Sequence, residues 1–149
     1  MYKLLIARNY TEEEFRQLWH DEYVMQTIYT HDGIHVHFYD NNFDHAFYES
    51  TGRNVSKKSG EYKNVLSFQR LARIRWIKDV LMDKSALMFV GYDKTTKKYA
   101  RNKRVSVVVG NYVVVIQLFL GKDNATHAKF ITAYVADNSI DKILRGPIW

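Results

Sequence analysis

Hydrophobic residues at helical spacing predict helices in the first half of the chain. Thr11 and Glu14 have the spacing of a capping box at a helix N-terminus. Hydrophobic residues follow at the positions expected for one face of that helix, namely Phe15, Leu18, Trp19 and Tyr23. We therefore predict a helix over residues 11–27. Residues 34–39 alternate as in a strand, and a polar loop over 50–63 then carries Arg53, Lys57, Lys58 and Lys63.

A second helical pattern runs from residue 64 to 82 and places two arginines toward the interior. On a wheel at about 100° per residue, one apolar arc contains Leu66, Trp76, Ile77, Val80 and Leu81. Arg73 falls inside this arc and Arg70 at its side, whereas Arg75 lies on the polar side. Arginines in such positions either bind an anion or form buried pairs with carboxylates such as Asp44 or Glu49. The sequence leaves both interpretations open.

The second half of the chain predicts four strands, at about 86–92, 98–109, 111–120 and 127–136, separated by short turn signals such as Gly110-Asn111. Short links between successive strands favour an antiparallel meander. The expected fold is therefore α+β, with N-terminal helices packed on a four-stranded antiparallel sheet. In the last strand, strict alternation places Phe130, Thr132 and Tyr134 on one face, and Lys129, Ile131 and Ala133 on the other.

Composition favours one basic domain that spans residues 1–149. The chain has one proline, no cysteine and no apolar run of the roughly 18 residues that a membrane helix needs, so we expect no membrane partner and a cytoplasmic location. Its formal net charge is +6, which attracts polyanions, and its 11 tyrosines and 8 phenylalanines offer faces on which unpaired bases stack. RNA is the expected partner, although many of these aromatic residues will be core.

Several residues have the chemistry to cleave RNA without a metal ion. Such cleavage needs a base for the ribose 2′-hydroxyl and donors for the phosphate charge. His45 is a candidate base, Arg70 and Arg73 are candidate phosphate ligands, and Thr132 and Tyr134 offer hydroxyl groups from a strand. Each of these residue types is also common in purely structural roles. Candidate substrate-binding residues besides Arg70 are Tyr48, Arg101 and Lys129.

The sequence gives weak grounds for a metal site or a cofactor. His35 and His37 form an H-x-H pair on one strand face, but no cysteine, no H-E-x-x-H helix and no further ligands at a familiar spacing accompany them. The chain also lacks a glycine-rich phosphate loop and a dinucleotide fingerprint. We therefore expect neither a bound metal nor a cofactor.

Five segments resemble the phage-associated nuclease-like domains that are grouped with barnase, EndoU, the tRNA-cleaving colicins and RelE. They lie at residues 44–49, 68–77, 89–93, 112–116 and 130–134 and occur in the same order as in that superfamily. The resemblance implies an RNA-cleaving cleft on a four-stranded antiparallel sheet, with His45, Arg73, Thr132 and Tyr134 as catalytic residues. It implies a hydrolase-like endoribonuclease, acting as a toxin or as a phage or defence effector on tRNA or other RNA.

Two further expectations follow from this resemblance. A toxic nuclease implies a neutralising partner, an antitoxin or immunity protein. The alternative function is a non-catalytic RNA-binding or partner-binding module on the same fold, because fold resemblance supports architecture more strongly than activity.

Overall fold

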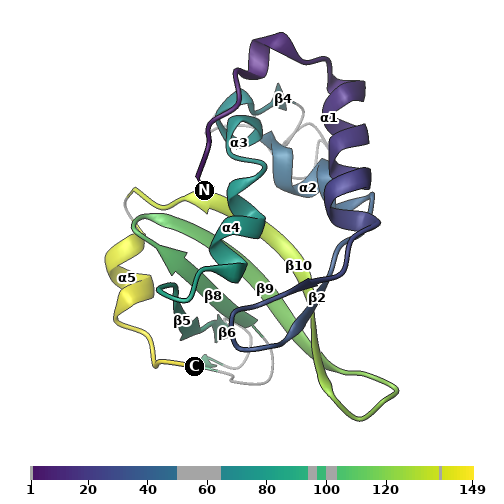
Figure 1. The fold of residues 1–149 in the computed structure, drawn as a ribbon. Coiled ribbons are helices and arrows are strands. Elements are labelled where there is room, and N and C mark those ends of the chain that lie inside the picture. Colours follow the sequence, from purple (N-terminus) through teal and green to yellow (C-terminus); the bar gives the residue numbers. More distant parts are fainter. Residues whose placement is uncertain (1, 50–64, 94–96, 100–103, 138) are drawn as a thin grey trace.

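A mixed sheet of six strands forms the centre of the molecule, in the order β1-β2-β10-β9-β8-β5 (Figure 1). The computed structural model describes residues 2–49, 65–93, 97–99, 104–137 and 139–149. Neighbouring strands are antiparallel except β2 and β10, which run parallel. The strands are β1 (Ile28–Tyr29), β2 (His35–His37), β5 (Leu87–Val90), β8 (Arg104–Val109), β9 (Tyr112–Leu120) and β10 (Thr126–Val135). Two short pairs lie outside this sheet, β3 (Tyr48–Glu49) with β4 (Val65–Leu66), and β6 (Tyr92–Asp93) with β7 (Lys98–Tyr99).

The α+β class is confirmed, whereas the predicted four-stranded antiparallel sheet is not. β5, β8, β9 and β10 are successive antiparallel neighbours, but β2 adds a parallel pair at the free edge of β10, and β1 follows it. The pairing of β2 with β10 joins segments about ninety positions apart, since His35 lies opposite His127. Local alternation carries no information about such a pairing, so the sequence pattern could not predict it.

A bulge in β10 overturns the predicted alternation of that strand. Phe130 pairs with Ile116 and Thr132 pairs with Val115, which leaves Ile131 as the extra residue. One extra residue shifts every following side chain to the other face. Phe130 therefore faces the same core as Ala133, while Thr132 and Tyr134 still share a face, now opposite to that of Phe130.

The first predicted helix is present with its capping box. Thr11 accepts a hydrogen bond from the Glu14 N–H, and the Glu14 carboxylate accepts one from the Thr11 N–H, which fixes the start of α1 (Glu12–Trp19). The chain continues as a π-helical segment over His20–Val24 and ends earlier than the predicted residue 27. A short 3-10 helix (Ala7–Asn9) precedes α1, and α2 (Asn42–Phe47) follows β2, so His45 lies within a helix.

The predicted helix over 64–82 is two helices, α3 (Phe68–Ala72) and α4 (Trp76–Met82), after the short strand β4. The Tyr23 hydroxyl explains part of the break, because it donates to the Ile74 carbonyl at 2.6 Å and accepts from the Lys78 N–H at 3.0 Å. These two groups would bond to each other in a continuous helix, so the hydroxyl is inserted in the helical hydrogen-bond ladder. The Leu5 N–H likewise donates to the Ala72 carbonyl at 2.9 Å, and so occupies an acceptor that a continuous helix would use.

The helical layer covers one face of the sheet and contains most of the core (Figure 1). Trp19 stacks on Tyr23 and lies edge-on to Phe38 and Phe47, and Phe130 of β10 completes this aromatic cluster. On the opposite face, α5 (Ile140–Leu144) covers a small cluster formed by Phe89, Val108, Val113 and Ala136. In the described part of the chain, none of the helices has both the length and the apolar character to cross a membrane.

Candidate functional site

Arg70 and Arg73 lie together in a small pocket on the helical side of β9 and β10, which we call the arginine pocket. Its volume is about 140 Å³, and its lining consists of Glu49, Gln69, Arg70, Arg73, Tyr112, Tyr134, Val135 and Asp137. The arginines come from the last residues of α3 and the turn after it, since Arg73 is the C-cap of α3 with φ −104° and ψ 17°. The break between α3 and α4 therefore places Arg73 at the pocket.

Backbone and aromatic contacts hold the two guanidinium groups. Arg70 Nη1 donates to the Ala46 carbonyl at 3.1 Å, and Arg73 Nη1 donates to the Gln69 carbonyl at 3.0 Å. Arg73 also lies over the ring of Trp76, at 5.0 Å from its centroid, a cation–π contact. In the described residues, Arg73 Nε is buried without a hydrogen-bond partner. Both guanidinium groups thus keep donor capacity beyond the bonds that position them.

The carboxylate pairs that the sequence left open are not formed among the described residues. Asp44 pairs with Arg16 at 2.6 Å, on the side of α1, and so is not a partner of Arg70 or Arg73. Glu49 and Asp137 line the same pocket as the arginines. The pocket lining therefore combines two arginines with two acidic residues. This combination suits a ligand that has both a phosphate group and hydroxyl donors.

Tyr112 forms the floor of the arginine pocket and remains protonated. Burial raises the pKa of its hydroxyl above the ordinary range, and the charges of Arg73 and Arg70 oppose part of this shift. Its ring also meets Trp76 edge-on, with the ring centroids 5.3 Å apart. The hydroxyl is consequently a hydrogen-bond donor at neutral pH and not a base.

The structure does not bring the four predicted catalytic residues together. Arg73 and Tyr134 both border the arginine pocket, but the Tyr134 side chain packs against the cluster beneath α5, on the opposite face of the sheet. Thr132 shares that opposite face because it pairs with Val115. His45 is exposed on α2 and is not part of the pocket lining. The two arginines of the helical wheel therefore share one pocket, whereas His45 and the Thr132 and Tyr134 side chains do not point into it.

The remaining predicted substrate-binding residues are dispersed. Tyr48 is half-buried against the core beneath the helices. Lys129 is exposed and lies opposite His37 in the register of β2 and β10. Arg101 and the basic residues of loop 50–63 lie outside the described residues.

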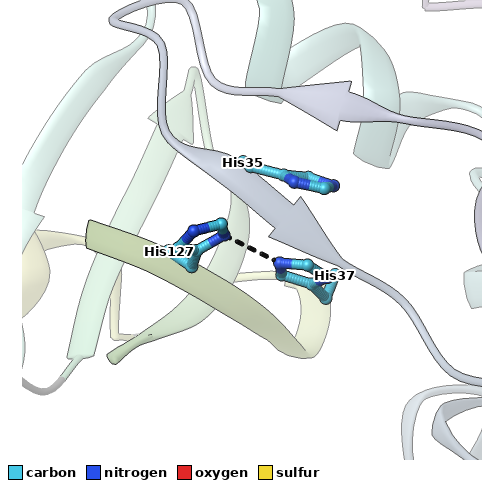
Figure 2. Close-up of side chains that lie close together, drawn as sticks. All are labelled: His35, His37 and His127. Atoms are coloured by element: carbon cyan, nitrogen blue, oxygen red, sulfur yellow. Dashed lines mark hydrogen bonds between the residues drawn. The ribbon is translucent and has the colours of Figure 1, made fainter. Parts of the chain in front are cut away.

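A second constellation consists of His35, His37 and His127, which we call the histidine cluster (Figure 2). His35 and His37 come from β2, and His127 comes from the neighbouring β10. Between them, Val36 and Ala128 are buried under the helices, so the three imidazoles project from the other face of the sheet. The nearest ring nitrogens, His37 Nε2 and His127 Nδ1, are 3.0 Å apart.

Asp123 orients one ring of the histidine cluster. Both of its carboxylate oxygens lie 3.0 Å from His127 Nε2, and the pKa of Asp123 is lowered by hydrogen bonds from the Ala125 N–H and from His127. This contact fixes the His127 proton on Nε2 when the ring is neutral, so Nδ1 presents a lone pair to His37. Burial lowers the pKa of His35 and of His37, and the neighbouring histidines lower each further. Both rings are therefore neutral at pH 7.

Sequence reasoning found the H-x-H pair but missed its partner. His127 lies ninety positions beyond His37, and no spacing rule connects a strand residue to a strand that pairs with it at long range. It likewise missed Gln69, Tyr112 and Asp137 in the arginine pocket, and considered Glu49 only as an ion-pair partner. Tyr112 and Asp137 lie at the ends of predicted strands, and Gln69 and Tyr112 also fall in segments of the nuclease resemblance, but none of these signals marks a pocket residue.

Comparison with known proteins identifies no relative of this chain. No protein-family model, no curated protein and no solved structure matches the chain. The resemblance to the barnase-like nucleases therefore stays a prediction, because fold resemblance alone does not establish an activity.

Proposed function

We propose that the protein is an endoribonuclease that cleaves RNA in the arginine pocket without a metal ion. One observation carries the proposal: Arg70 and Arg73 line a single pocket of about 140 Å³ together with Glu49. A guanidinium fork matches the oxygens of a phosphate, and two of them favour the extra negative charge of the transition state. The net charge of +6 attracts an RNA polyanion to the surface.

Glu49 replaces His45 as the proposed general base. Glu49 borders the pocket, whereas His45 does not. In the proposed step, Glu49 takes the proton of the ribose 2′-hydroxyl, and the 2′-oxygen attacks the phosphorus. The bond from phosphorus to the 5′-oxygen breaks, and that oxygen takes a proton from a water molecule, which the Glu49 carboxylic acid re-protonates. The products are a 2′,3′-cyclic phosphate and a 5′-hydroxyl end, with Tyr112 as a neutral donor to a phosphate oxygen.

The second candidate is a module that binds RNA through the same pocket without cleaving it. The separation of His45 and Thr132 from the arginine pocket favours this alternative, because a nuclease needs a proton donor for the leaving group. A cytoplasmic toxin or phage effector with a neutralising partner protein remains the biological setting that the sequence resemblance suggests.

Cleavage of labelled total tRNA by the purified chain distinguishes the two candidates. We expect wild-type cleavage, and a loss of about 100-fold or more in Glu49→Gln and in Arg73→Lys, which keeps the charge but removes the fork. Arg145→Ala is the matched control, since Arg145 is an exposed arginine beside α5 and outside the pocket. RNA binding without cleavage in the wild type supports the binding module. Equal cleavage by all four proteins contradicts the assignment of the pocket.

A further inference from the structure

The three side chains of the histidine cluster are arranged around one point, and the proposed ribonuclease reaction does not involve them. It lies on the sheet face opposite the arginine pocket and near the other end of β10. We propose that His35, His37 and His127 bind one Zn²⁺ ion and leave a fourth coordination position open to water or an anion. This inference stands independently of the proposed function.

The distances between the ring nitrogens fit a tetrahedral ion. Zinc binds imidazole nitrogens at about 2.0–2.1 Å, which sets neighbouring ligand nitrogens about 3.3 Å apart. His37 Nε2 and His127 Nδ1 are 3.0 Å apart, and one ligand nitrogen from each of the three rings lies within 4.8 Å of the others. The three nitrogens thus lie near the spacing of a zinc site, and we expect rotation of the rings to bring them around one ion.

The outer contacts of His127 are those of a metal ligand. Its Nε2–H donates to Asp123, and a carboxylate behind the imidazole fixes the tautomer and increases the basicity of the coordinating nitrogen. In the metal-free chain, the lone pair on His127 Nδ1 accepts a hydrogen bond from His37 Nε2–H. When the ion binds, His37 adopts its Nδ1–H tautomer, so Nε2 is released for the metal without net proton transfer.

The turn before β10 is shaped around this pair. A Cβ atom at Gly121 would lie 2.6 Å from an Asp123 carboxylate oxygen and would also collide with the His127 ring. Only glycine allows the turn to approach the ring so closely. Phe119 stacks on His127, and Tyr29 lies beside His35, with ring centroids 5.6 Å and 5.2 Å apart. These contacts restrict the ring rotations and so lower the cost of ordering the ligands.

The donor set selects the class of metal. Three neutral imidazoles suit Zn²⁺, Cu²⁺ and Ni²⁺, and they disfavour Mg²⁺ and Ca²⁺, which prefer oxygen ligands. Three protein ligands leave one position of a tetrahedral zinc ion open. The charged neighbours of the cluster in the described residues are Asp123, which faces His127, and Lys129, which lies opposite His37 in the register. We expect the open position to take water.

Metal binding is measured on the untagged full-length chain after removal of metal with EDTA and exchange into chelator-free buffer. Isothermal titration with ZnCl₂ should give one Zn²⁺ per chain, and Co²⁺ should give the visible absorption of a tetrahedral site. His127→Ala should abolish this stoichiometric binding. His20→Ala is the matched control, because His20 also contacts a carboxylate, Asp40, at 2.9 Å but lies in the π-helical segment after α1, outside the cluster. It should bind Zn²⁺ as the wild type does.

Two results overturn the metal site. The first is a wild-type chain that binds no stoichiometric Zn²⁺, and the second is a loss of binding in His20→Ala equal to that in His127→Ala. Circular dichroism shows whether each variant folds. If His127→Ala does not fold, Asp123→Asn decides, with Asp40→Asn as its control. We expect a 10- to 100-fold lower affinity in Asp123→Asn alone, the usual effect of removing such a carboxylate. Equal affinities in the two variants contradict the inference.

Discussion

The arginine pocket and the histidine cluster lie on the same strand, β10, but are built in different ways. The first lies under the helical layer near the end of β10, and the second lies on the opposite face near its start. At about 3.3 Å per residue, the two are separated by roughly 20 Å along the strand. The arginines come from one helix and the turn after it, whereas the histidines come from two strands that pair at long range.

The two sites depend on different structural features. The arginine pocket requires α3 to end at Ala72, and thus depends on the Tyr23 hydroxyl and the N-terminal segment that occupy the groups of a continuous helix. The histidine cluster depends on the register of β2 with β10, on the turn at Gly121 and on the contact of His127 with Asp123. Val36 and Ala128 anchor its two strands under the helical layer. Loss of the break between α3 and α4 should therefore affect the arginine pocket more than the histidine cluster.

The largest difference between the two faces of the sheet is expected in the free energy of unfolding after loss of an aromatic side chain. Phe130 is fully buried between Trp19 and Phe38 on the helical face, whereas Phe119, beside the histidine cluster, is 39% exposed. Phe130→Ala should lower the free energy of unfolding by about 3–5 kcal/mol, because it leaves a cavity in the aromatic core. Phe119→Ala should cost less than about 1 kcal/mol. Urea unfolding measures both, and equal losses would contradict the described difference between the faces.

The next largest effect is expected in the rate of RNA cleavage. Variants in the arginine pocket should lose activity, and variants on the opposite face of the sheet should not. Arg73→Ala should lower the cleavage rate about 100-fold, because a donor to the transition-state phosphate is removed. Thr132→Val and Tyr134→Phe should change the rate less than about 2-fold, since both side chains lie on the other face. Circular dichroism accompanies the assay because Arg73 also packs on Trp76. A 100-fold loss in Thr132→Val would instead restore the site predicted from the sequence.

A smaller effect is expected in the salt dependence of RNA binding. Each contact to a single-strand phosphate contributes about 0.7 to the slope of log affinity against log salt. Arg73→Ala should therefore reduce the slope by about 0.7, and His35→Ala, in the histidine cluster, should leave it unchanged. Fluorescence anisotropy of a labelled RNA at several salt concentrations measures the slope. Identical slopes for the wild type and Arg73→Ala would exclude a phosphate contact at Arg73.

The smallest effect concerns acid stability at the N-terminal segment. Hydrogen bonds from Ser85 and from the Tyr2 hydroxyl lower the pKa of the Asp83 carboxyl. A lowered folded-state pKa gives stability that is present above the ordinary pKa and is lost as the pH falls through the folded value. The difference in stability between wild type and Asp83→Asn should thus shrink below about pH 4. Urea unfolding at several pH values measures it, and a constant difference would rule out this linkage.

The fold could be predicted from local patterns up to the point where distant segments meet. The capping box at Thr11 and the period-2 runs of β8 and β9 identified their elements because each signal lies within one segment. The bulge at Ile131 and the parallel pairing of β2 with β10 left no such signal, since both arise from contacts between strands. The wheel placed Arg70 and Arg73 near one inward face, and both line one pocket although the helix that it assumed is interrupted at Arg73.

The candidate sites show the same division. Two arginines on an inward face were visible in the sequence because one helical turn relates them, and the structure places both at one pocket. His127 was not visible as a partner of His35 and His37, because only the register of the sheet relates them. Thr132 and Tyr134 were correctly predicted to share a face, but their position relative to the arginines depends on the bulge in β10.

Cleavage of 5′-labelled tRNA in EDTA tests the central claim most directly, because it asks whether the arginine pocket acts without the metal that the histidine cluster is proposed to bind. We expect the EDTA-treated chain to cleave at the rate of the zinc-loaded chain and to leave 2′,3′-cyclic phosphate and 5′-hydroxyl ends. Cleavage that disappears in EDTA and returns with ZnCl₂, or products with 3′-hydroxyl ends, would contradict it and would transfer the chemistry to the histidine cluster.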